Sequence, residues 1–283
     1  MCLADGVRVR DLEPVEETAL LTLYCRALDN RRSEPILGDS LADEVAAELD
    51  YDFAGLGVMA STERFVALRA KMLDTRIRAF TAEYPNAVVV DLGAGLSSAL
   101  FRVGPPATVD WYSVDLPAVI ALRDAVLPRH HRAHSVAASL TEDTWAEAIP
   151  ADRPAMVMAD GLFAFLREPT LVALFRGIST HFHSGALTFY DYGKVPRVSR
   201  VVGSVLPSRR RMTRLLSSTW AFDGFADAHH PETWNPRLHL IEEASAMQEP
   251  DIAAFPPIWR LAAAASSRIP AIARKARVLS YRF

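Results

Sequence analysis

The sequence predicts an α/β fold, built as a doubly wound and mostly parallel sheet. Apolar runs of strand length alternate with helical patterns from residue 87 to residue 191. The first run, AVVVDL at 87–92, is continuously apolar and ends in a glycine-rich turn. Strands that are buried on both faces have this composition, and a repeated strand–helix–strand order favours parallel pairing.

Three helices are expected before the sheet begins. Each has apolar residues that recur at helical spacing. Asp39 or Ser40 can cap the second helix, and Pro85 ends the third. The helices are predicted at 16–28, 41–49 and 63–84. We assign residues 1–86 to N-terminal helices that belong to the same domain as the sheet.

The core of the domain is expected to cover residues 87–283. Its strands are predicted at 87–92, 111–115, 134–138, 154–160 and 186–191, with helices at 117–126 and 169–181. Residues 192–250 do not continue this alternation of strands and helices, and they contain Gly, Pro, Ser and a basic run. We interpret 192–250 as a helical insertion that caps the site, followed by late strands at 238–241 and within 271–283.

The composition limits the functional classes. A chain of 283 residues with 50% apolar residues supports one large domain. Its 34 acidic and 31 basic residues argue against a nucleic-acid partner, which usually requires a basic excess. Cys2 and Cys25 cannot provide a disulfide framework or a cysteine zinc site. Without a secretory signal pattern or an apolar run of about 20 residues, we expect a cytoplasmic protein with no membrane association.

The segment VVVDLGAGLSS at 88–98 predicts a nucleotide-type site. Gly93 and Gly95 allow the backbone to pass close to a ligand at the end of a parallel strand. A dinucleotide site has a third glycine, but Ser98 stands there, and Asp91 would repel a pyrophosphate. S-adenosylmethionine has no phosphate, and its ammonium and sulfonium tolerate acids. The spacing therefore favours this methyl donor, although Asp91 could instead only orient the loop.

A second acid supports an adenosine-containing ligand. Asp115 ends the next predicted strand, where a carboxylate can accept hydrogen bonds from both ribose hydroxyls. Enzymes that bind NAD also use an acid at this strand end to bind the ribose. Asp115 alone therefore does not distinguish NAD from S-adenosylmethionine. An exposed acid at a strand end is the alternative interpretation.

These motifs resemble the leucine carboxyl methyltransferase family. VVVDLGAGL followed by WYSVDLPAVIALR is similar to its bacterial branch of polyketide O-methyltransferases, the tetracenomycin type. The similarity continues in ETALLTLYCRALDNRRSEPILGDSLADEVAAELDYDF, FVALRAKMLDTRIRAF, MVMADGLFAFL and the terminal YRF. It implies a Rossmann-like class I methyltransferase fold, S-adenosyl-L-methionine as cofactor, and methyl transfer to an oxygen of a small-molecule acceptor.

The resemblance also implies roles for individual residues. Arg69 matches an arginine that holds the donor carboxylate, although by itself it could be a solvated helix residue. Gly93 matches a glycine that contacts the methionyl part of the donor, and Asp115 matches the acid that binds the donor's ribose. Two positions differ from the family: Ser139-Leu140 replaces an acid and Leu near the adenine, and Asp160 replaces a Glu. These differences leave a non-catalytic donor-binding protein as an alternative.

The catalytic residues are not identified by the sequence. Tyr190, Asp191 and Tyr192 end the fifth predicted strand, where open α/β sheets bind ligands. His229, which precedes His230, could act as a base or could face solvent. A phenolic acceptor would benefit from a base, whereas a carboxylate is already ionised at neutral pH.

Other polar and aromatic clusters have two interpretations each. His181 and His183 are expected near a helix C-terminus, and no third ligand for a metal is suitably spaced. The basic run 209–214 could attract an acidic acceptor or form a solvated face. Aromatic residues could line an acceptor pocket or fill the core; these are Phe163, Phe165, Trp220, Phe222 and Phe225.

We therefore expect an S-adenosylmethionine-dependent O-methyltransferase that acts on a small carboxylic acid or phenol of polyketide type. Methylation of a protein C-terminal carboxylate is an alternative, but it would require a groove for an extended peptide. No oligomeric state is predicted.

Overall fold

The computed structural model describes residues 7–9, 12–193, 210–266, 268–269, 273–274 and 276–283. Within them, seven strands form one sheet in the order β5-β4-β3-β6-β7-β9-β8. The first five in this order are parallel, whereas β9 is antiparallel to both its neighbours. The strands are β3 Val88–Leu92, β4 Asp110–Asp115, β5 Ala133–Ala137, β6 Ala155–Ala159, β7 Gly185–Asp191, β8 His239–Ser245 and β9 Arg277–Arg282.

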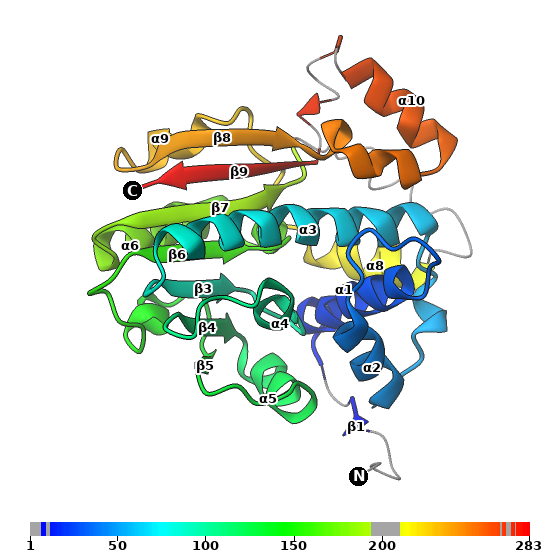
Figure 1. Ribbon diagram of the computed structural model, residues 1–283, viewed down its shortest axis with the longest axis horizontal. Helices are drawn as coiled ribbons and strands as arrows, with labels where there is room; N and C mark the ends of the chain where they lie inside the picture. Colours follow the sequence, from blue (N-terminus) through cyan, green and yellow to red (C-terminus); the bar gives the residue numbers. More distant parts are fainter. Residues whose placement is uncertain (1–6, 10–11, 194–209, 267, 270–272, 275) are drawn as a thin grey trace.

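Helices cover both faces of the sheet, as expected for a doubly wound fold (Figure 1). They are α1 Pro14–Asn30, α2 Ser40–Glu48, α3 Ala60–Glu83, α4 Ala99–Val103, α5 Pro117–Val126, α6 Glu168–His181, α8 Arg210–Thr219, α9 His230–Trp234 and α10 Pro257–Ser266. Asp39 caps α2 by accepting from Ala42 N. None of the helices in the described ranges is long and apolar enough to cross a membrane.

Alternate residues of the central strand belong to two different hydrophobic clusters. Val88 and Val90 pack in a cluster with Phe175 of α6. Val89 packs in the other cluster, which contains Leu73 and Ile77 of α3. All five residues of β3 are buried, which explains why this strand is continuously apolar up to Asp91.

The parallel register brings the ends of the central strands to one edge of the sheet. Asp91 is opposite Ser113 of β4 and Met158 of β6, so β3, β4 and β6 end together. Asp115 is the last residue of β4, and Asp160 directly follows β6. Three acids that are far apart in the sequence therefore lie at the same edge.

The first three predicted helices and first five predicted strands are confirmed, with small differences at their ends. The later region differs more. The described part of 192–250 contains α8 and α9, and β8 is longer than the predicted strand 238–241. A short parallel pair, β1 Val7–Arg8 with β2 Leu49–Asp50, was not predicted, nor was α10. Residues 194–209 lie outside the described residues, and the interpretation of 192–250 as one capping insertion stays a prediction.

Candidate active site

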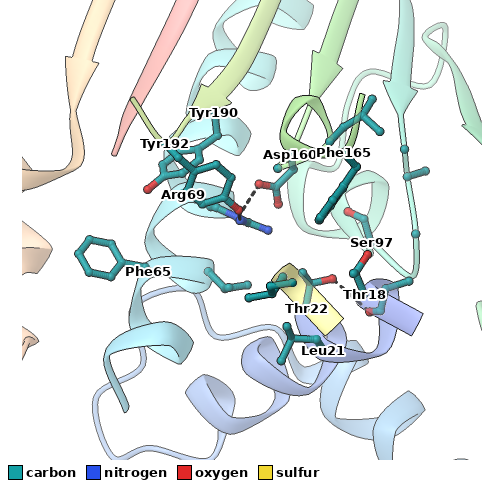
Figure 2. Close-up of a pocket in the computed structure, with 18 of the residues that line it drawn as sticks. Thr18, Leu21, Thr22, Phe65, Arg69, Ser97, Asp160, Phe165, Tyr190 and Tyr192 are labelled. Carbon is teal, nitrogen blue, oxygen red and sulfur yellow. Dashed lines mark hydrogen bonds and ion pairs between the residues drawn. The ribbon is translucent and has the colours of Figure 1, made fainter. Parts of the chain in front are cut away.

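A cavity of about 390 Å³ opens at the carboxyl edge of the sheet. Its walls come from the ends of β3, β4, β6 and β7 and from the helices α1 and α3 (Figure 2). This is the edge where open α/β sheets bind their ligands, and the size is typical of a small-molecule site.

The loop after β3 needs glycine at two positions. Gly93 has φ +63°, and a Cβ atom there would lie 2.7 Å from Leu162 Cδ1. Gly95 has φ +50°, and its Cβ would lie 3.2 Å from Ala19 Cβ. Left-handed backbone and close neighbours both favour glycine. Both glycines line the cavity, as predicted.

Two buried arginines hold the carbonyl groups of this loop. Arg123 of α5 donates from Nη1 to the oxygens of Gly95, at 3.0 Å, and Ser97, at 2.7 Å. Arg26 of α1 donates from Nη2 to the oxygen of Leu96 at 2.8 Å. These bonds fix the loop from the protein side. Neither arginine could be predicted from the sequence, because an arginine in an amphipathic helix resembles an ordinary solvated residue.

The same network explains Ser98, which stands where a dinucleotide motif has its third glycine. The Ser98 hydroxyl donates to the buried Asp39 carboxylate. Arg26 Nε and Arg102 Nη1 lie 3.1 and 2.8 Å from Asp39 Oδ2. Burial alone would raise the pKa of Asp39, but the two guanidinium groups hold it below its usual value. Ser98 therefore helps to anchor the loop to the N-terminal helices.

Asp115 is fixed at the other side of the loop. Its Oδ2 accepts from Gly95 N and its Oδ1 accepts from Leu116 N, both at 2.7 Å. Burial raises the pKa of Asp115, although these two hydrogen bonds act against the shift. The carboxylate lines the cavity and has lone pairs left for a ligand.

Asp91 lines the cavity, and one of its carboxylate oxygens accepts no hydrogen bond from the described part of the chain. Its side chain is buried, and Oδ2 has no hydrogen-bond partner within the described part of the chain. Burial raises the pKa of Asp91 to about 7; Asp160 and Asp115 add to the shift, whereas Arg123 opposes it. A buried acceptor of this kind needs a donor or a positive charge from a ligand.

Arg69, which the resemblance assigns to the donor carboxylate, forms an ion pair in the cavity with Asp160, the residue that replaces a Glu of the family (Figure 2). Arg69 Nε lies 2.7 Å from Asp160 Oδ1. Arg69 Nη1 also donates to the Tyr192 hydroxyl. Burial alone would lower the pKa of Arg69, but the Asp160 carboxylate outweighs it and raises the pKa.

Gly161, which was not predicted from the sequence, leaves room for the ion pair of Arg69 and Asp160. It has φ +75°, and a Cβ atom at Gly161 would lie 2.8 Å from Arg69 Nη1. The neighbouring Tyr190 ring completes the surroundings, with its centroid 5.6 Å from Arg69 Cζ. The guanidinium group of Arg69 is thus held beside a carboxylate at the end of β6.

Comparison with known proteins identifies the family. Residues 19–179 match the family model of leucine carboxyl methyltransferases, which covers more than half of the chain. The chain belongs to the leucine carboxyl methyltransferase family. The matched range contains the glycine loop after β3, Asp115 and the ion pair of Arg69 with Asp160, and it confirms the resemblance found in the sequence.

Individual relatives agree with this family. The tetracenomycin polyketide synthesis O-methyltransferase TcmP of Streptomyces glaucescens is 35% identical over 277 residues, which cover 96% of this chain and 98% of TcmP. The S-adenosyl-L-methionine-dependent methyltransferase dpfgK of Gibberella zeae is 28% identical over 191 residues, or 62% of this chain and 64% of dpfgK. The similarity to TcmP agrees with the resemblance to polyketide O-methyltransferases found in the sequence.

Solved structures support the fold. The magnesium protoporphyrin IX methyltransferase ChlM of Synechocystis, solved with bound S-adenosylhomocysteine, superposes with a TM-score of 0.50 at 10% identity, covering 94% of this chain and 99% of ChlM. A crystal structure from Thermobifida fusca, assigned as a methyltransferase, gives a TM-score of 0.54 at 16% identity, covering 91% and 93% of the two chains. The predicted class I methyltransferase fold is confirmed.

Two family positions do not line the cavity. The Ser139 hydroxyl is 2.7 Å from Thr141 Oγ1, just beyond β5. Leu140 packs against the core cluster on the α6 side and borders a separate cavity between residues 140–147 and α6. A role for Ser139 and Leu140 at the adenine stays a prediction for this family member.

The fold separates the catalytic candidates Tyr190, Asp191 and His229, whereas Tyr192 lines the cavity beside Tyr190. Tyr190 lines the cavity, and burial raises the pKa of its hydroxyl. Asp191 does not line this cavity; it is buried and its Oδ2 lies 2.9 Å from both Nε and Nη2 of Arg277. His229 is exposed, with Nδ1 2.7 Å from Glu232 Oε2, and lies outside the cavity lining. Of these three candidates, only Tyr190 faces the cavity.

The other histidines and the basic run have structural contacts. His181 Nε2 lies 2.8 Å from the Ile149 oxygen, and His183 Nδ1 lies 3.3 Å from the Ala151 oxygen. No group of three metal-ligating side chains occurs in the described ranges. Of the basic run 209–214, Arg211 binds Glu17 of α1 at 2.7 Å, Arg209 lies outside the described residues, and the side chains of residues 210 and 214 are not described.

The aromatic candidates divide into two groups. Phe163, Phe222 and Phe225 are buried in the core cluster, so they do not form the cavity wall. Phe165 and Trp220 line the cavity, as the pocket interpretation predicted. Further apolar lining residues that the sequence did not indicate are Leu21, Phe65, Leu162, Leu216, Met247 and Trp259.

Proposed function

We propose that this protein is an S-adenosyl-L-methionine-dependent O-methyltransferase that acts on a small polyketide-type molecule with a carboxylate or phenolic hydroxyl. The observation that carries this proposal is the acid excess of the cavity. Its lining contains the carboxylates of Glu16, Asp91, Asp115 and Asp160, against the guanidinium groups of Arg26 and Arg69. Both arginines are already paired with acids, so a pyrophosphate would be repelled, whereas an ammonium and a sulfonium would be attracted.

Individual residues of the cavity are suited to individual chemical groups of the methyl donor. Asp115 is suited to the ribose hydroxyls, and Gly93 and Gly95 allow the donor to approach the backbone. Arg69 has the planar fork that suits a carboxylate. Asp160 and the unmet Oδ2 of Asp91 are suited to the donor ammonium. When bound, the donor supplies a methyl group that its sulfonium has activated.

The chain's own contribution is mainly alignment of the acceptor oxygen. Holding two reactants in line can contribute about 7–11 kcal/mol in favourable systems. Because burial raises the pKa of Tyr190, this hydroxyl keeps its proton and is suited to donate a hydrogen bond to the acceptor. Small-molecule acceptors are supported by TcmP, whose name assigns it to tetracenomycin polyketide synthesis. Cytoplasmic location stays a prediction.

Calorimetric titration tests the donor. We expect S-adenosylmethionine and S-adenosylhomocysteine to bind with one site per chain, and NADH not to bind. Absence of heat and of a thermal shift with both adenosyl ligands would overturn the proposal. Binding of the donor without methyl transfer to any carboxylic acid or phenol in a polyketide panel would favour the non-catalytic alternative.

A further inference from the structure

We propose that Tyr192 is a positioning residue, which orients the guanidinium group of Arg69 toward the carboxylate of the methyl donor. Tyr192 directly follows β7 and lines the same cavity as Arg69. The inference deepens the proposed function and rests on it, because that function assigns the donor carboxylate to Arg69.

The ion pair of Arg69 with Asp160 leaves both partners incompletely satisfied. Arg69 Nε and Asp160 Oδ1 lie 2.7 Å apart, yet both atoms are buried and neither has a hydrogen-bond partner in the described part of the chain. Their contact is therefore electrostatic, without the alignment that a hydrogen bond requires. Buried polar atoms of this kind need a partner, and the donor's amino-acid group can offer a carboxylate to the arginine and an ammonium to the acid.

The hydrogen bond that Arg69 does make is to Tyr192. Arg69 Nη1 donates to the Tyr192 hydroxyl, and the centroid of the Tyr192 ring lies 5.8 Å from Arg69 Cζ. Nε faces Asp160 and Nη1 is held by Tyr192, so Nη2 is the nitrogen that these two contacts leave for a ligand. Figure 2 shows that the guanidinium group points into the cavity.

Without the Tyr192 hydroxyl, the guanidinium group would be free to turn toward Asp160. A guanidinium group and a carboxylate interact most strongly through two parallel hydrogen bonds. An Arg69 in this arrangement would use its fork on Asp160 and would withdraw both groups from the donor. The hydroxyl opposes this closure because it holds Nη1 in place.

The Tyr192 hydroxyl can orient Arg69 without neutralising it. Burial raises the pKa of Tyr192, although the Arg69 charge acts against the shift. The hydroxyl therefore keeps its proton at neutral pH, and its oxygen accepts from Arg69 as an uncharged group. The positive charge of Arg69 remains available for a carboxylate.

The Tyr192 ring is itself held by its neighbours. It packs edge-to-face on Tyr190, with centroids 5.0 Å apart at 85°, and its centroid lies 5.0 Å from that of Trp220. Trp220 is fixed in turn, because its Nε1 donates to the Phe222 oxygen at 2.6 Å. A hydroxyl on a ring that is fixed before binding can direct Arg69 at little cost in conformational entropy.

Two ligands that differ in the carboxylate test this role. The protein is titrated calorimetrically with S-adenosylhomocysteine and with its decarboxylated analogue S-adenosyl-3-thiopropylamine, which keeps the adenosine, the sulfur and the ammonium. We expect the parent to bind S-adenosylhomocysteine about 10- to 150-fold more tightly, the range that corresponds to one charged hydrogen bond. Affinity for the analogue is measured by displacement of S-adenosylhomocysteine where direct titration is too weak.

Tyr192→Phe keeps the ring and removes only the hydroxyl. It should weaken S-adenosylhomocysteine by about three- to twelvefold and the analogue by less than twofold, because only the first ligand has a carboxylate for Arg69. A general distortion of the cavity would weaken both ligands alike. Tyr24→Phe is the matched control, because this half-buried ring stacks on Phe53 outside the cavity lining; it should leave both affinities within twofold of the parent.

The outcomes separate this inference from the proposed function. If S-adenosylhomocysteine does not bind the parent, the proposed function fails, and the role of Tyr192 with it. Three other results would overturn the role of Tyr192 while donor binding stands. These are equal losses for both ligands in Tyr192→Phe, no loss for either ligand, and equal affinity of the parent for the two ligands.

Discussion

Replacing Asp115 by Asn removes one charge and changes little else in shape. The parent carboxylate accepts from Gly95 N and Leu116 N at 2.7 Å each. An amide has one acceptor oxygen, so one of these N–H groups would face an NH₂ group instead. The same loss applies on the ligand side, where one ribose hydroxyl would no longer find a charged acceptor.

The size of the effect follows from these bonds. A hydrogen bond to a charged group contributes about 1.5–3 kcal/mol. Loss of one ribose bond therefore costs about 1.5–3 kcal/mol of donor binding, whereas loss of the loop bond lowers the stability of the free protein as well. Even the lower value corresponds to a fall in affinity of about tenfold. Asp115→Ala, which keeps neither acceptor, should abolish detectable binding.

The assay is calorimetric titration with S-adenosylhomocysteine, with thermal unfolding to confirm that the variants fold. Asp124→Asn is the matched control, because this exposed acid on α5 accepts from Ser135 Oγ and lies outside the cavity. It should bind within twofold of the parent. If Asp115→Asn also binds within threefold, our placement of the ribose is wrong.

Four further predictions concern the loop and its supports. Affinity for S-adenosylhomocysteine should rise about tenfold from pH 6 to pH 8, because the pKa of Asp91 is about 7 and its ionised form attracts the ammonium; Asp91→Asn should flatten this calorimetric profile. Burial also means that the folded protein holds the Asp91 proton more tightly than the unfolded chain. Its stability contribution is therefore full below pH 3.8 and is lost as the pH rises through about 7, a trend that thermal melts of Asp91→Asn should lack. Gly93→Ala should lower the free energy of urea unfolding by about 2–4 kcal/mol, because it adds backbone strain and a clash with Leu162. Gly104→Ala, at φ +57° in open space, should cost about 1–2 kcal/mol from strain alone. Equal losses in the two variants would contradict the clash. Asp39→Asn should cost about 3–5 kcal/mol in the same assay because it removes the carboxylate charge beside the buried Arg26, whereas Arg102 keeps its ion pair with Asp74; Asp43→Asn, at a surface acid, should cost less than about 1 kcal/mol. A loss no larger than the control's would refute the network.

Much of the donor side could be predicted from local patterns. Parallel strands that are buried on both faces have continuous apolar sequences, and they end at the same edge of the sheet. Asp91, Asp115 and Asp160 could therefore be placed together from the order of the strands alone. The glycine positions followed from the same turn.

The supports of the loop could not be predicted, because their burial depends on tertiary contacts. Arg26 and Arg123 are in helices whose patterns look amphipathic, and only packing shows that their guanidinium groups face the loop carbonyls. Ser98 was considered only as a missing glycine. Its hydrogen bond to Asp39 joins residues 59 positions apart, which no local pattern indicates.

The elements after residue 192 were harder to predict from the sequence for a different reason. β8 alternates poorly because it is an edge strand with exposed residues and a register shift between Leu240 and Glu242. α10 has exposed apolar residues, Ile258 and Leu261, so its pattern does not mark one buried face. Trp259 could be assigned to the cavity only from the structure.

The strand order of the sheet has a consequence for how the protein assembles. β9 follows β8 in the chain but lies between β7 and β8, so β8 has no neighbour to pair with until residues 277–282 are available. During synthesis, the segment up to Asp191 can form its five parallel strands while the rest of the nascent chain is still on the ribosome. α10, which lies between β8 and β9 in the chain, is tethered at both ends only once this last pairing forms. Truncation before residue 277 would remove the buried Val278, Leu279 and Tyr281 and leave β8 without a partner strand.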